Sequence, residues 1–116
     1  MTTTLNTPKF HLKTLLDQSG RTRNQKVAAL ATLMLGVVEA LSRDALDPTG
    51  ATIALFNAEN CIYVHRQLKN PAADEIMSRG VQLTDLFDIL PPGKAKAEFA
   101  KELEAMRRLS VGLLRR

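Results

Sequence analysis

The chain has 116 residues and a net charge of +4, from 16 Lys or Arg and 12 Asp or Glu. This length is typical of a single domain that buries its own core without a metal or disulfide. An apolar fraction of 45% excludes general disorder. The lone Cys61 excludes an intrachain disulfide and is typical of a reducing compartment. Because a basic and then apolar signal segment is absent from the first residues, we predict a cytoplasmic protein.

The first helix is predicted to follow a polar N-terminus. Residues 1–6 are expected to be disordered, and residues 7–116 to form the single domain. Thr7 and Pro8 form a helix-start signal, a capping hydroxyl followed by proline at the first helical position. Gly20 is expected to end this helix in the left-handed conformation. The predicted inward residues of this helix are Phe10, Leu12, Leu15 and Leu16.

The central stretch runs from Val27 to Leu41 and is predicted to stay helical to about Ala45. It is apolar on more than one side, which is typical of a helix inside a bundle or a membrane. It contains Glu39 and is shorter than the roughly 20 apolar residues that a spanning helix needs. We therefore predict the buried central helix of a soluble bundle and no membrane association.

Small residues recur every four positions along this central helix, at Ala28, Thr32, Gly36 and Ala40. Glycine inside a helix costs about 1 kcal/mol relative to alanine, so Gly36 indicates a close helix crossing. The crossing helix is either the last helix of the same chain, through Ala95, Phe99 and Leu103, or the same helix of a second copy. We favour a homodimer, because two-fold dimers are the commonest assembly.

Two further start signals, Asp47-Pro48 and Asn70-Pro71, divide the middle of the chain. A short helix is predicted to end near Asn57, and another to cover 59–68 with Ile62, Tyr63 and Leu68 inward. A strand is the alternative for the β-branched stretch 61–65, but it would lack a partner strand. The next helix is predicted to end at Gly80, and Thr84 to cap a separate amphipathic helix.

The last helix is predicted from about Lys94 to Leu114, with an inward stripe at Phe99, Leu103, Met106, Leu109 or Ser110, and Leu113. The predicted fold is all-α: a compact bundle of one long buried central helix, a long C-terminal helix and several short helices. The strings LATLMLGVVEALSRDAL, LFN and SRGVQLTDLFDILPP resemble a set of small uncharacterised bacterial helical proteins. This resemblance implies a bacterial all-helical domain and transfers no functional residue.

Candidate chemistry is sparse in this sequence. Cys61 and His65 lie four apart, as two metal ligands on one helix face would, but no further ligands stand near them. The same pair does not form a recurrent nucleophile–base arrangement. Asp85 and Asp88 alternate with apolar residues and are expected to face solvent. With no glycine-rich phosphate loop either, we predict no catalytic, cofactor or metal site and no enzymatic activity.

Charge is unevenly distributed along the chain. Residues 1–38 and 89–116 each carry a net charge of +4, and residues 39–88 carry −4. The main hypothesis is a protein-interaction or assembly module, whose basic ends pair with its acidic middle. The alternative is an accessory nucleic-acid-binding protein with basic terminal segments. Its expected phosphate contacts are Arg21, Arg23, Lys26, Arg107, Arg108, Arg115 and Arg116.

Overall fold

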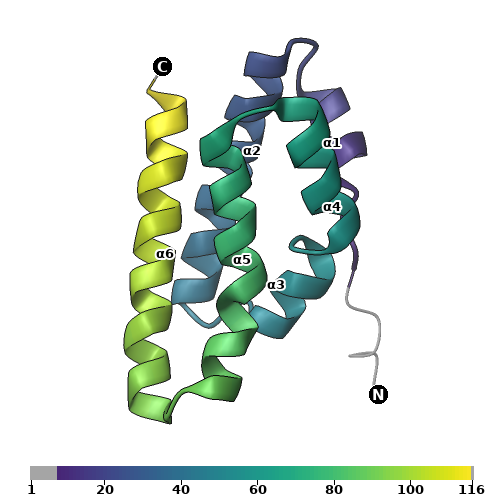
Figure 1. The fold of residues 1–116 in the computed structure, drawn as a ribbon. Coiled ribbons are helices and arrows are strands. Elements are labelled where there is room, and N and C mark those ends of the chain that lie inside the picture. The colour runs from purple at the N-terminus through teal and green to yellow at the C-terminus, as the bar shows by residue number, and fades with distance from the viewer. Residues whose placement is uncertain (1–7, 116) are drawn as a thin grey trace.

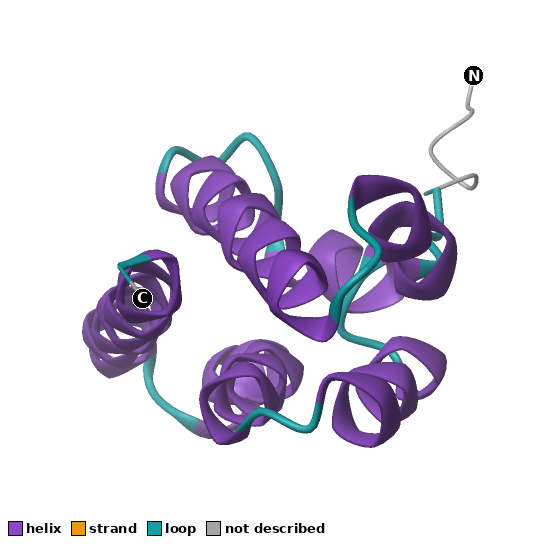
Figure 2. Cartoon of the chain, turned by 90° about the horizontal axis from the view of Figure 1, so that it is seen from above, coloured by secondary structure: helices purple, strands orange, loops and turns teal. Residues whose placement is uncertain are grey.

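The computed structural model describes residues 8–115, and every regular element among them is helical (Figure 2). In chain order the elements are α1 (Leu12–Ser19), α2 (Arg23–Ser42), α3 (Pro48–Ala54), α4 (Ala58–Tyr63), the π-helical turn η2 (Val64–Leu68), α5 (Pro71–Ile89) and α6 (Pro92–Leu114). The predicted all-α fold class is confirmed. Residues 1–6, Thr7 and Arg116 lie outside the described residues.

The long helices run up and down, so the connections between them gather at two ends of the molecule (Figure 1). Helix α2 packs antiparallel against α6, and α5 lies beside α6. Helix α1 packs against α2 and α4, and α3 packs against α5. The α1–α2 turn, the η2–α5 turn and the C-terminal end of α6 lie at the upper end in Figure 1. The α2–α3 and α5–α6 connections lie at the lower end.

Side-chain caps begin four of the helices as local chemistry requires. Thr22 and Gln25 form a reciprocal capping box at the start of α2. Asp47 accepts a hydrogen bond from the Gly50 amide at 2.6 Å, and Asn70 accepts one from the Ala73 amide at 3.0 Å. Both predicted start signals in the middle of the chain are therefore confirmed. The start signal predicted at Thr7 and Pro8 is wrong, since α1 begins at Leu12.

Helix α2 supplies the centre of the core, but from one side only. Leu30, Met34 and Val38 are fully buried, whereas 39% of its most apolar 18-residue window is buried. The predicted central helix is therefore buried on one side, because α1, η2 and α6 leave its outer face open. By length and composition alone α2 could cross a membrane, as the core helix of a soluble protein also could. Here it packs inside a folded bundle.

One continuous helix, α5, replaces the two that were predicted around Gly80. Gly80 is buried within α5, and a Cβ placed on it would lie 2.3 Å from ring carbons of Phe56. The glycine therefore provides room for an aromatic ring instead of ending a helix. The stripe of α6 is confirmed, with Leu103, Met106 and Leu113 buried.

Three smaller predictions are also wrong. Gly20 is extended, with φ −172°, and its missing side chain leaves room for Gln25, whose Cβ would lie 2.5 Å from an added Cβ. Helix α2 ends at Ser42 rather than near Ala45. Phe10 and Ile62, expected to face inward, are 44% and 50% exposed. Phe10 lies before the first residue of α1, and Val64 is buried where Ile62 was expected, whereas Leu12 is buried as predicted.

Candidate functional site

The middle of the small-residue stripe of α2, at Thr32 and Gly36, is exposed. A Cβ added at Gly36 would meet no atom within 4 Å. Thr32 is exposed and its hydroxyl donates to the Ala28 carbonyl at 3.0 Å, while Ala28 and Ala40 are half-buried. The last helix packs on another side of α2, so the predicted crossing at Gly36 within one chain is wrong. At one end this face borders a hollow of about 620 Å³ beside the α1–α2 turn.

The basic residues expected to contact phosphate are in two different states. Lys26 pairs with Asp17 at 2.9 Å, and Arg107 and Arg108 lie 3.4 and 3.9 Å from Glu104. Arg21, Arg23 and Arg115 are exposed and form no ion pair with the described residues 8–115, and Arg116 lies outside them. The terminal basic segments therefore keep only part of their charge for an external partner.

Two cations that the sequence analysis did not select lie next to these. Arg66 is in η2 and Lys69 follows it, both exposed and neither in an ion pair with a described acidic side chain. Lys69 has φ 47°, in the left-handed region. The Lys-Asn-Pro string could have signalled a tight turn, but only the fold brings this turn to the α1–α2 turn and the C-terminal end of α6 (Figure 1).

Cys61 and His65 lie on the same side of α4 and η2 and line one hollow with Asp74. His65 Nδ1 is 3.1 Å from Asp74 Oδ2. Burial, aided by the Asp74 charge, raises the pKa of the Cys61 thiol. A neutral thiol is a weak nucleophile and a poor metal ligand. Among the described residues, no three His, Cys, Asp or Glu side chains are placed to hold a metal ion.

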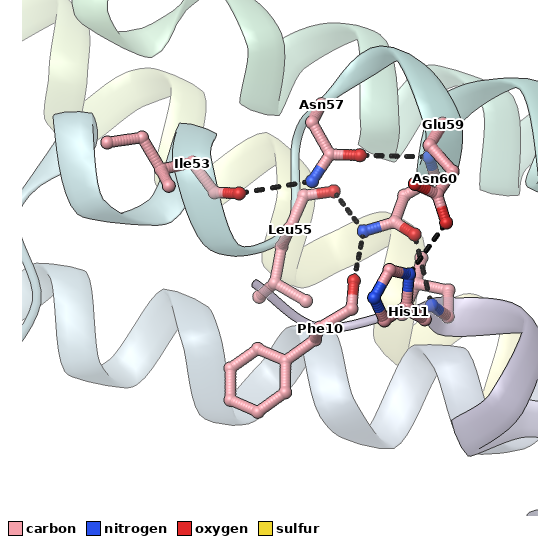
Figure 3. Close-up of polar contacts among 8 residues, drawn as sticks. Phe10, His11, Ile53, Leu55, Asn57, Glu59 and Asn60 are labelled. Carbon is pink, nitrogen blue, oxygen red and sulfur yellow. Dashed lines mark hydrogen bonds and ion pairs between the residues drawn. The ribbon is translucent and has the colours of Figure 1, made fainter. Parts of the chain in front are cut away.

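A buried amide that the sequence analysis missed holds the N-terminal segment onto α4 (Figure 3). Asn60 Oδ1 accepts a hydrogen bond from the Leu12 amide at 3.0 Å. Asn60 Nδ2 donates to the Phe10 carbonyl at 2.7 Å and to the Leu55 carbonyl at 3.0 Å. Nearby, His11 Nδ1 is 2.7 Å from Glu59. Because both ends of the Asn60 amide are occupied within the chain, this network is structural and not a ligand site.

An apolar hollow of about 280 Å³ opens at the lower end of the bundle. Phe87 and Phe99 form one wall, with ring centroids 5.3 Å apart and planes at 63°. The other lining residues are Leu41, Asp44, Leu46, Asp47, Pro48 and Lys96. The edge-to-face pair joins α5 to α6. We therefore interpret this hollow as part of the packing between helices and not as a ligand site.

No protein-family model, curated protein or solved structure matches this chain. The resemblance to small bacterial helical proteins therefore stays a prediction, and the function is argued from the geometry alone.

Proposed function

We propose that this protein is a non-enzymatic, cytoplasmic interaction and assembly module that self-associates through the outer face of α2. The observation that carries this proposal is the open position of Gly36 on the most apolar long helix of the chain. Burying apolar helix surface lowers the free energy of a soluble protein. A glycine in the middle of a helix costs stability, and this cost can be offset where a second helix packs closely against it.

The outer face of α2 is chemically suited to such an approach. Its small side chains let a second backbone come close, as Gly and Ala interfaces do. The Thr32 hydroxyl already donates a hydrogen bond to the Ala28 carbonyl within the helix. Its donor would therefore stay satisfied in an interface that excludes water. Leu33 and Leu35 are half-buried on either side of the stripe and offer apolar area to a partner.

A second copy of the same chain is the occupant that this face fits best. A two-fold axis near Gly36 would place the small stripe of one copy against that of the other, so that both glycines serve one crossing. The lack of enzymatic activity is supported by the Cys61 thiol, whose raised pKa opposes its use as a nucleophile.

The mass of the protein in solution tests this proposal. We expect the wild type to elute as a dimer in size-exclusion chromatography with light scattering, and Gly36→Leu to elute as a folded monomer with an unchanged helical circular-dichroism spectrum. Gly112→Leu is the matched control, because Gly112 is also an exposed helical glycine with no atom within 4 Å of an added Cβ. A wild type that stays monomeric at every concentration, or a Gly36→Leu dimer, contradicts the proposal.

A further inference from the structure

Five cations from three distant parts of the sequence lie at the upper end of the bundle. The α1–α2 turn and the first residue of α2 carry Arg21 and Arg23, the η2–α5 turn region carries Arg66 and Lys69, and the end of α6 carries Arg115. Figure 1 places all three segments at one end, and Figure 2 looks down on it. We call these five residues the basic end.

Of the carboxylates near the basic end, Asp74 shares a hollow with Arg66 and Lys69 and lies 3.1 Å from His65 Nδ1, and the others are paired with other cations. Asp17 is bound by Lys13 and Lys26, both at 2.9 Å. Glu104 is engaged by the two arginines of α6 that precede the end. None of the five cations makes an ion pair with an acidic side chain of residues 8–115.

The backbone at Lys69 adds an independent observation. Its φ of 47° is the left-handed conformation of a helix C-cap, where glycine is the residue that fits without steric cost. A lysine here works against the local preference of the turn. Asp44, between α2 and α3, shares this conformation with φ 59°, and residues other than glycine that are held in it are found often at functional positions.

The opposite end of the molecule has an excess of acidic side chains, four exposed aspartates against Lys94 and Lys96 at the start of α6. Asp44 and Asp47, between α2 and α3, and Asp85 and Asp88, in the last turns of α5, are exposed there. Because the overall charge distribution of a protein steers its association with charged partners, this separation of charge orients the basic end toward an approaching polyanion.

We infer that the basic end binds the phosphate backbone of duplex DNA without reading its sequence. The five cations come from three separate segments, as contacts to several successive phosphates require. A single phosphate bound in the hollow beside Lys69 would lie next to the Asp74 carboxylate, whereas a duplex backbone can contact the five cations outside that hollow. Single-stranded nucleic acid would need exposed aromatic platforms, and Tyr63, which shares a hollow with Arg66, is half-buried.

An anionic membrane is the other polyanion, and the distribution of apolar side chains disfavours it. Ile89, 76% exposed, ends α5 at the opposite end, and Ile53 lies on α3 there. Next to the basic end, the large exposed apolar residues are Leu114 on α6 and Ile62 on α4, which lines a hollow with Arg66, and they lie on different helices. Membrane-surface binding combines basic charge with a buried apolar face, which this end lacks.

Fluorescence anisotropy with a labelled duplex of about 20 base pairs and mixed sequence tests the inference. If all five cations contact phosphates, affinity falls roughly 500-fold between about 50 and 200 mM salt. The triple variant Arg21→Gln/Arg66→Gln/Arg115→Gln should bind more than about tenfold more weakly and lower the salt slope by about 3. The matched control Lys9→Gln/Lys94→Gln/Lys96→Gln removes the same net charge elsewhere and should stay within about twofold of wild type.

Lys69→Gly separates binding from folding, because glycine suits the left-handed backbone. We expect an unchanged or higher melting temperature, and a salt slope lowered by about 1. The inference is overturned by absence of binding at low salt, by equal losses in both triple variants, or by capture on phosphatidylserine vesicles without binding to the duplex. It does not depend on the α2 interface, which Gly36→Leu tests separately.

Discussion

The ring of Phe56 lies against the backbone of Gly80, so close that a Cβ on residue 80 would stand 2.3 Å from two ring carbons. Phe56 follows α3 and is 1% exposed, and Gly80 lies in the middle of α5. This contact explains why a residue that disfavours helices stands inside a 19-residue helix. Glycine is the one residue that lets α5 pass this close to the ring.

Gly80→Ala is expected to destabilise the fold by about 1–3 kcal/mol, because the added methyl group must displace a fully buried ring. Gly112→Ala is the control, since its Cβ meets no atom within 4 Å and alanine favours a helix by up to about 1 kcal/mol. Urea unfolding followed by circular dichroism measures both. Equal effects of the two substitutions would show that Phe56 moves aside at little cost.

Asn60→Ala is expected to destabilise the protein by about 3 kcal/mol, because it strands the Leu12 amide, the buried Leu55 carbonyl and the partly buried Phe10 carbonyl. Asn57→Ala, which removes the side-chain cap of α4 and an exposed hydrogen bond to the Ile53 carbonyl, should cost about 1 kcal/mol. Hydrogen exchange adds a local readout. The Leu12 amide should lose protection in Asn60→Ala and keep it in Asn57→Ala, and retained protection in both would contradict the assigned role.

Stability should fall in acid partly through Asp17. Hydrogen bonds from Lys13 and then from Lys26 hold the pKa of Asp17 below its ordinary 3.8. A carboxyl group with a lowered pKa in the folded state stabilises the fold above its unfolded pKa, and this contribution is lost as pH falls through the folded value. Asp17→Asn should therefore lose less stability than wild type below about pH 4. Unfolding curves at stepped pH check this, and a parallel acid limb in the variant refutes it.

Asp85 and Asp88 are exposed on α5 and form no ion pair with the described residues. Replacing both with asparagine should change the free energy of unfolding by less than about 0.5 kcal/mol, the usual range for surface positions. Chemical denaturation measures the change. A loss of several kcal/mol would mean that these carboxylates stabilise the fold through the basic segments, as the charge pattern of the sequence first suggested.

Local chemistry determined much of the secondary structure. Asp47-Pro48 and Asn70-Pro71 specify helix starts because their side chains accept hydrogen bonds from amides three residues on. The spacing of Leu103, Met106 and Leu113 identified the inward face of α6 in the same way. Caps and helical periodicity act within a few residues, so the sequence alone carries them.

Tertiary packing decided what such short-range rules do not include. Only the Phe56 ring distinguishes Gly80 as a contact point from Gly80 as a helix end. Only the direction of the helices brings Lys69 to the same end as Arg115, and only packing shows that Lys26 is engaged by Asp17. A protein surface is formed by residues that are distant in sequence. Its net exposed charge depends on which charged side chains pair within the fold, and short-range sequence patterns do not contain this information.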